Sequence, residues 1–311
     1  MRLSFMGTPI FALPSLKALM AAGHEICLVV TQPDRPAGRG RVSTPPPIKL
    51  AAQELGLPLL QPEKVGEPTV IAALQAARPE AIIVVAYGQL LPKSILTLPP
   101  HGCLNVHASL LPKYRGAAPI SWAIIRGETV TGVTMMQIEA RMDAGPLLLQ
   151  RAEPIRPHDT TATLSERLAV LGAKLLCQTL DQVARDTVHL VPQDECRATY
   201  APKLLPTDTH LDWARDAWTL DCLIRGLCPA PGAVTNFGER HIKVLQADVE
   251  AAVDSLPGTV CAVDQKKGIL VAAKSGGLWL TQVQPENRRA MAATEFARGY
   301  RVRVGDGFGT F

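Results

Sequence analysis

Over the first two thirds of the chain, short apolar segments alternate with stretches in which apolar residues recur every three or four positions. The apolar segments include Arg2 to Gly7, Glu25 to Thr31 and Ala81 to Ala86, and helical spacing is present at Phe11 to Ala22 and Val70 to Ala77. Strands that are apolar on both faces and separated by helices are typical of a parallel sheet covered on both sides. The pattern therefore predicts a doubly wound, Rossmann-like α/β domain with a mostly parallel sheet.

The same region continues with further strands and a long helix. We expect strands at Cys103 to Ser109 and Val130 to Ile138, and the sequence from Thr163 to Glu166 has the form of a capping box. An apolar stripe at helical spacing follows it, made of Leu164, Leu168, Leu171 and Leu175. A long helix is therefore predicted to close this region.

The pattern changes after about residue 190. Residues 190–206 are rich in proline and polar residues and predict a linker. Short strand candidates separated by Gly, Pro and charged turns follow, at His241 to Leu245, Gly258 to Val263, Gly268 to Ala272, Gly277 to Val283 and Tyr300 to Val304. We therefore expect three parts: residues 1–189 as an α/β domain, 190–206 as a linker and 207–311 as a small β-barrel or sandwich.

Composition excludes few classes of protein. The 311 residues are 47% apolar and 19% charged, as in ordinary globular proteins, and the net charge of +4 does not by itself indicate nucleic-acid binding. The seven cysteines are odd in number and contain no C-x-x-C pair, which favours free thiols over disulfides or a zinc site. No signal peptide or membrane-length apolar run is evident, so we expect a cytoplasmic protein.

Candidate chemistry begins at the predicted strand Cys103 to Ser109. Asn105 and His107 are two residues apart and therefore share one face of that strand. Pro112 interrupts the strand soon afterwards, which places both side chains near its carboxyl end, where open α/β sheets bind ligands. At this point they are either a catalytic pair or an amide and an imidazole that pack a loop.

Two charged residues near other strand ends bear on that choice. Asp143 lies among small and apolar residues directly after the next strand, and a carboxylate beside an imidazole would orient it and favour its charged form. Arg115 provides a cation ahead of a proline-started helix at Ile120 to Arg126. Taken alone, Asp143 could equally form a turn, and Arg115 could be a solvated charge.

Five stretches together resemble the methionyl-tRNA formyltransferases. They are Gly7-Thr-Pro-Ile-Phe-Ala12, the run Thr31-Gln-Pro-Asp-Arg-Pro-Ala-Gly-Arg-Gly40, Asn105-Val-His107-Ala-Ser-Leu-Leu-Pro112, Arg115-Gly116 and Asp143-x-Gly145. The Asn/His/Asp set alone would indicate only a folate-dependent formyltransferase, because glycinamide-ribonucleotide formyltransferases share it.

The resemblance implies transfer of a formyl group from 10-formyltetrahydrofolate to the α-amine of methionine on initiator tRNA. In that reaction Asn105 would donate a hydrogen bond to the developing oxyanion, His107 would accept or relay the amine proton, and Asp143 would orient His107 or hold a relaying water. The sequence leaves direct and water-relayed proton transfer open. It shows no metal-ligand cluster and no nucleophile–base pair, so we expect the formyl group to pass directly from donor to acceptor, without a covalent enzyme intermediate and without a metal.

The resemblance also implies binding sites. The folate donor is expected to contact Tyr87, Gly88, Gln89, Leu90, Ser109, Leu110, Leu111, Pro112, Glu139, Ala140, Arg141 and Met142. Phe11 would line the methionine pocket. The expected tRNA contacts are Arg35, Arg39 and Arg41 in the long proline-rich loop 34–47, together with Arg115, and Arg39 would read the weak first base pair of initiator tRNA. The C-terminal domain is expected to be an OB-like barrel that binds tRNA, and the chain to be a monomer.

Three alternatives remain. A formyltransferase acting on glycinamide ribonucleotide or an amino sugar nucleotide would not explain the arginine-bearing loop or the second domain. A nicotinamide dehydrogenase should carry Gly-x-Gly-x-x-Gly after the first strand, where Gly7-Thr8-Pro9 stands instead. A non-catalytic RNA-binding protein would not need Asn105, His107 and Asp143 at adjacent strand ends.

Overall fold

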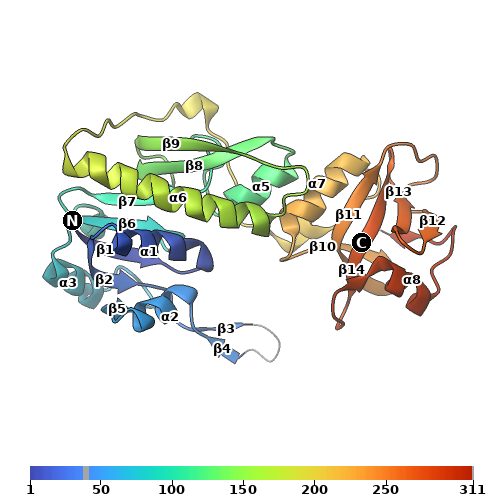
Figure 1. The fold of residues 1–311 in the computed structure, drawn as a ribbon, viewed down its shortest axis with the longest axis horizontal. Coiled ribbons are helices and arrows are strands. Elements are labelled where there is room, and N and C mark those ends of the chain that lie inside the picture. The colour runs from blue at the N-terminus through green and yellow to red at the C-terminus, as the bar shows by residue number, and fades with distance from the viewer. Residues whose placement is uncertain (38–41, 310–311) are drawn as a thin grey trace. The chain divides into compact units, whose positions relative to one another are not determined.

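A computed structural model describes residues 1–37 and 42–309 of the chain, which divide into two compact units (Figure 1). Unit 1 consists of Met1–Pro119, Val130–Pro154 and Ser165–Ala201. Unit 2 consists of Ile120–Thr129, Ile155–Leu164 and the residues from Pro202 on.

Unit 1 is built on a seven-stranded sheet in the order β5-β2-β1-β6-β7-β8-β9. Its strands are β1 (Arg2–Gly7), β2 (Glu25–Val30), β5 (Leu59–Leu60), β6 (Ala81–Val85), β7 (Cys103–His107), β8 (Val130–Gln137) and β9 (Leu147–Pro154). Its helices are the 3-10 turn η1 (Ile10–Ala12), α1 (Leu13–Ala21), α2 (Pro47–Glu54), α3 (Pro68–Ala77), α4 (Lys93–Leu96) and most of α6 (Thr161–Ala184). A small hairpin, β3 (Arg35–Ala37) with β4 (Val42–Thr44), stands apart from the sheet.

Side-chain alternation gives the sheet two buried faces. On one face Met6, Ile82 and Val84 join an apolar cluster with residues of α3 and α4. On the other face α6 approaches β7 and β8 so closely that a Cβ at Gly172 would lie 2.8 Å from Val106 Cγ1. Helices on both faces confirm the predicted Rossmann-like architecture, in which central strands are apolar throughout.

The sheet is parallel only as far as β7. The pairs β7–β8 and β8–β9 are antiparallel, and β9 was not anticipated from the sequence. Its second half, Gln150-Arg-Ala-Glu-Pro154, is mostly exposed because β9 is an edge strand, so it lacks the apolar signal of a buried strand.

Helix α6 begins at Thr161, two residues before the predicted capping box. The capping contacts are instead made between Thr160 and Thr163. The Thr163 amide donates to Thr160 Oγ1 (3.3 Å), and the Thr160 amide donates to Thr163 Oγ1 (3.0 Å). Thr160 therefore takes the role that the sequence pattern gave to Thr163.

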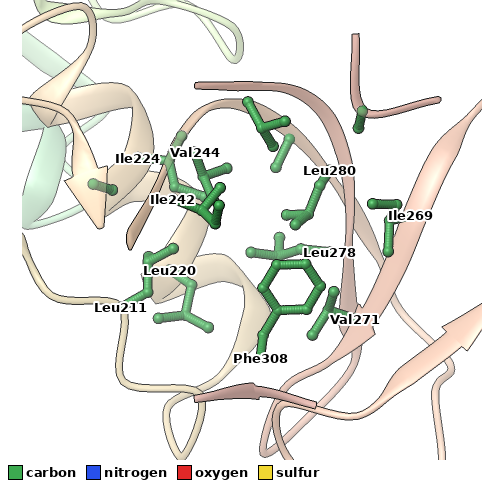
Figure 2. Close-up of a cluster of buried hydrophobic side chains, with 14 of the residues drawn as sticks. Leu211, Leu220, Ile224, Ile242, Val244, Ile269, Val271, Leu278, Leu280 and Phe308 are labelled. Atoms are coloured by element: carbon green, nitrogen blue, oxygen red, sulfur yellow. The ribbon is translucent and has the colours of Figure 1, made fainter. Parts of the chain in front are cut away.

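Unit 2 contains an antiparallel sheet in the order β12-β13-β14-β11-β10-β16. Its strands are β10 (Ala233–Phe237), β11 (Arg240–Glu250), β12 (Val260–Asp264), β13 (Gly268–Ala272), β14 (Gly277–Pro285), β15 (Met291–Ala292) and β16 (Phe308–Gly309), and its helices include α5 (Pro119–Ile125), α7 (Ala217–Leu227) and α8 (Ala293–Tyr300). The sheet curls, so that an isolated bridge between Thr259 and Gly307 connects the chain beside β12 with the chain beside β16. Leu220 and Ile224 of α7 pack with Phe308 and strand residues in its core (Figure 2).

The strand predicted at Tyr300 to Val304 is absent. Residue 300 ends α8, and Arg301 adopts a left-handed conformation (φ 56°) as the helix cap. The alternation Tyr-x-Val-x-Val imitates a strand, but the ring of the fully buried Phe296 stacks on Tyr300 at 4.5 Å, which holds Tyr300 in the last turn of α8, and residues 301–304 form an irregular connection after the helix.

Two short segments from earlier in the chain, 120–129 and 155–164, pack with α7 in unit 2. Thr161 Oγ1 donates to the Gly226 carbonyl at 2.6 Å, and Arg225 Nη1 donates to the Asp159 carbonyl at 3.3 Å. A Cβ at Gly226 would lie 2.4 Å from Ile125 Cγ1, so only glycine allows this contact. Across residues 1–37 and 42–309, no helix is long and apolar enough to cross a membrane, and no cluster of three or more His, Cys, Asp or Glu side chains could hold a metal ion.

Candidate active site

Asn105 and His107 project from the same face at the carboxyl end of β7. In the β7–β8 ladder Asn105 pairs with Met136 and His107 pairs with Thr134. Asn105 is half-buried, and within the described part of the chain its amide makes no hydrogen bond to the protein. The amide is therefore free to bond a substrate at the place where α/β sheets hold ligands.

The His107 imidazole is 5% exposed and is held at both nitrogens. Nε2 lies 3.0 Å from the Tyr114 carbonyl oxygen, and Nδ1 lies 3.7 Å from Asp143 Oδ2. A carbonyl can only accept, so Nε2 carries a proton and Nδ1 is the nitrogen that gains or loses one. The 3.7 Å separation is an ion-pair distance rather than a hydrogen bond.

The loop from Ser109 to Gly116 presents the Tyr114 carbonyl to His107. Ser109 Oγ donates to the Lys113 carbonyl (2.6 Å), and Thr134 Oγ1 donates to the Ser109 carbonyl (2.6 Å). Tyr114 has a left-handed backbone (φ 63°), and its amide donates to Thr199 Oγ1 at 2.9 Å. A non-glycine residue in that region costs energy, which these bonds offset.

Asp143 lies in the connection between β8 and β9. Its Oδ2 accepts a hydrogen bond from the Gly116 amide at 2.8 Å, and its backbone is left-handed (φ 49°). Gly145 permits this arrangement, because a Cβ there would lie 2.0 Å from the Gln137 carbonyl oxygen. The structure thus brings Asn105, His107 and Asp143, predicted from separate motifs, to one end of the sheet.

Arg115 is 1% exposed and does not present its guanidinium to solvent. It bonds Glu195 through Nη1 (3.1 Å) and Nη2 (2.9 Å), and these contacts raise the pKa of the guanidinium. The tRNA contact predicted for Arg115 stays a prediction, and it would require a phosphate to displace the half-exposed Glu195 carboxylate from the guanidinium.

The segment that the sequence suggested as a linker is bonded into unit 1 over residues 191–201. Val191 and Leu147 exchange two backbone hydrogen bonds (2.8 and 2.9 Å). The Arg115 amide donates to the Thr199 carbonyl (2.9 Å), and the Ala201 amide donates to the Arg115 carbonyl (2.7 Å). This part of the chain is therefore a wall of the site rather than a free connection.

The residues expected to bind folate fall into three loops beside β6, β7 and β8. Tyr87 is buried among apolar side chains, burial raises its pKa to about 12, and its carbonyl accepts bonds from Thr8 and Gln32. Leu90 and Met142 are 70% and 56% exposed, respectively. The remaining members are Gly88 and Gln89 in the first loop, Ser109, Leu110, Leu111 and Pro112 in the second, and Glu139, Ala140 and Arg141 in the third.

The predicted tRNA loop is described only in part. Arg35 lies in β3, is exposed and pairs with Glu63 at 2.5 Å. Arg39 and Arg41 lie outside the described residues. Phe11 lies half-buried in η1, directly after β1.

Several residues that shape the site were not anticipated from the sequence. Thr134, Gln193, Glu195 and Thr199 hold the loops that carry Tyr114, Arg115 and Asp143. Thr134 could have been found from its place opposite His107 once β7 and β8 are paired. Gln193, Glu195 and Thr199 carry no local signal, because their partners lie 48 to 85 residues away.

Comparison with known proteins identifies the family. The formyl transferase family matches residues 1–180, and the formyl transferase C-terminal domain matches residues 203–301. The methionyl-tRNA formyltransferase of Pelotomaculum thermopropionicum is 47% identical over 301 residues, which are 96% of this chain and 96% of that protein. The chain belongs to the methionyl-tRNA formyltransferase family. The enzyme of the same name from Geobacter metallireducens is 44% identical over 97% of this chain and 96% of its own length.

Solved structures share the fold of this methionyl-tRNA formyltransferase family member at low identity. HypX from Aquifex aeolicus, in complex with tetrahydrofolic acid, has a TM-score of 0.69 and 18% identity over 98% of this chain and 48% of that protein. An N-formyltransferase from Helicobacter canadensis, in complex with folinic acid and dTDP-3-aminofucose, has a TM-score of 0.64 and 15% identity over 89% of this chain and 97% of that one.

Proposed function

We propose that this chain transfers the formyl group of 10-formyltetrahydrofolate to the α-amine of methionine carried by initiator tRNA, with Asn105, His107 and Asp143 as its catalytic residues. The observation that carries the proposal is the convergence of an unengaged amide, a buried imidazole and a carboxylate at one end of the sheet. Near-full-length similarity to methionyl-tRNA formyltransferases supports the choice of substrates.

The reaction needs a donor for a developing negative charge. The amine nitrogen attacks the formyl carbon, the carbonyl π electrons move to oxygen, and the C–N10 bond then breaks to release tetrahydrofolate. Asn105 donates its amide N–H to that oxygen, a contribution of about 3 kcal/mol in other acyl transfers. Because this amide bonds none of the residues that the structure describes, binding the oxyanion breaks no bond seen there.

The reaction also moves one proton from the attacking amine to N10 of the donor. His107 Nε2 is already committed to the Tyr114 carbonyl, so Nδ1 takes up the proton. Asp143 Oδ2, 3.7 Å away, stabilises the imidazolium that results, and the Gly116 amide holds that oxygen in place. Direct transfer and transfer relayed by a water would use the same residues.

The binding regions follow from the same proposal. The loops that contain Tyr87 to Leu90, Ser109 to Pro112 and Glu139 to Met142 bind the folate donor, and Phe11 lines the methionine pocket. Residues 34–47 contact tRNA through Arg35, Arg39 and Arg41. Residues 207–311 form an OB-like barrel that binds tRNA, and the Thr259–Gly307 bridge supports closure of that barrel. The chain acts as a monomer in the cytoplasm.

The test is a formyl-transfer assay with the single variants Asn105→Ala, His107→Ala and Asp143→Ala. Each is expected to lower kcat at least about a hundredfold, as for oxyanion and acid–base groups. Exposed Gln178→Ala on α6 serves as the matched control and should keep full activity. Near-normal turnover in one variant would remove that residue from the mechanism.

Substrate choice is tested in the same assay. Charged initiator tRNA should be used well, whereas charged elongator tRNA, glycinamide ribonucleotide and an amino sugar nucleotide should be poor acceptors. Arg39→Ala should reduce use of tRNA and leave folate binding intact. Equal loss of folate affinity would show that the loop supports the fold instead.

A further inference from the structure

Gln193 connects the buried Arg115 to the loop that carries Asp143. Its Nε2 donates to the carbonyl oxygens of Asp143 (2.8 Å) and Gly145 (2.7 Å). Its Oε1 accepts from Arg115 Nε (3.1 Å) and Nη2 (2.8 Å). The orientation of this amide is fixed by chemistry, because carbonyls only accept and a guanidinium only donates. Both donors and both acceptor positions of the amide are therefore used.

The loop needs such a support. Asp143 has a left-handed backbone (φ 49°), which a non-glycine residue holds only where neighbouring bonds impose it. Gln193 bonds the carbonyl of Asp143 itself and that of Gly145, two residues later. One of the two peptide groups that flank Asp143, and the peptide group that follows Gly145, are thus tied to one amide.

The same short segment makes a third attachment through Glu195. Its carboxylate binds the buried Arg115 (2.9 Å) and Arg141 (2.8 Å), which precedes Asp143 in the loop. Residues 193 and 195 therefore hold the connection between β8 and β9 at positions 141, 143 and 145. Arg115 is the common anchor, since it is fully buried and bonds both side chains.

We propose that Gln193 is a positioning residue for formyl transfer, which sets the backbone of Asp143 and thereby the carboxylate that faces His107. The proposal rests on the catalytic role proposed for Asp143. A displacement of about 1 Å at a reacting group can cost about a hundredfold in rate. Among the described residues, Gln193 bonds Arg115 and this connection but no other loop assigned to substrate, so its loss should lower kcat with little change in KM for either substrate.

Two substitutions test whether Gln193 acts by positioning Asp143 or only by holding Arg115 in place. Gln193→Ala removes all four bonds, whereas Gln193→Glu retains acceptors for Arg115 and cannot donate to the two carbonyls. Both should lower kcat by about tenfold to a hundredfold, while Gln178→Ala should not. Activity retained in Gln193→Glu and lost in Gln193→Ala would overturn the proposal, because holding Arg115 would then suffice.

A double-mutant cycle with Asp143→Ala distinguishes positioning from general destabilisation. In single-turnover assays Gln193→Ala should have little further effect once Asp143 is replaced. If the two losses multiply, Gln193 does not act through Asp143 and the proposal fails. If Asp143→Ala alone is fully active, the proposed role of Asp143 fails. If it is impaired while Gln193→Ala and Gln193→Glu are not, only the inference about Gln193 fails.

Discussion

Gly145→Ala tests whether close backbone packing in the β8–β9 connection holds the candidate site. A Cβ at this position would lie 2.0 Å from the Gln137 carbonyl oxygen, and ordinary contacts begin at 3.4 Å, so the two must separate by about 1.4 Å. Asp143 is two residues away, and its carboxylate lies 3.7 Å from His107 Nδ1. A shift of this size breaks the bond from Gln193 to Gly145 and moves the carboxylate.

The expected cost is about 1 to 3 kcal/mol in the free energy of unfolding, as for other overpacked sites, and about a hundredfold in kcat from misplacement of Asp143. Denaturant unfolding and the formyl-transfer assay measure the two quantities. Gly66→Ala is the matched control in unit 1, since its Cβ would lie 3.5 Å from Pro92 Cγ, an ordinary contact. Gly145→Ala with wild-type kcat would refute the reasoning, because the loop would then tolerate displacement.

Two further predictions concern titratable groups. Hydrogen bonds from Arg115 and Arg141 lower the pKa of Glu195 from 4.5 to about 2, so its stabilising contribution is complete above pH 4.5 and is lost as the pH falls toward 2. The stability difference between wild type and Glu195→Gln should accordingly shrink over that range in acid unfolding, and a difference independent of pH would contradict the pairing. Burial raises the pKa of the Cys103 thiol to about 12, whereas Cys196 is exposed. Alkylation of the native protein followed by peptide mapping should therefore find Cys196 modified and Cys103 protected, and early labelling of Cys103 would show that β7 opens readily.

The sequence predicted those parts of the fold that depend on local patterns. Strands such as β6, with five apolar residues, are recognisable because they are buried on both faces. The edge strand β9 was missed because its outer half is polar, and a strand was predicted wrongly at Tyr300 to Val304 because the residues that follow helix α8 alternate like a strand.

In the candidate site, too, local features could be predicted from the sequence and long-range contacts could not. Asn105 and His107 could be paired from their spacing alone, because the side chains of a strand alternate. The partners of Arg115 could not be predicted from the sequence, since Gln193 and Glu195 lie 78 and 80 residues away in the chain. A buried arginine and a surface arginine look alike in sequence, and only the tertiary ion pair tells them apart.

The bonds between residues 191–201 and the Ser109 to Gly116 loop also bear on the order in which the molecule is completed during synthesis. Every strand of the unit 1 sheet has left the ribosome once Pro154 has emerged, and α6 follows by Ala184. The Tyr114 amide and the Arg115 guanidinium receive these partners only with Gln193, Glu195 and Thr199. A nascent chain that ends near residue 189 would contain the whole sheet with Arg115 still unpaired. Catalytic competence should therefore arise later in translation than the sheet that supports it.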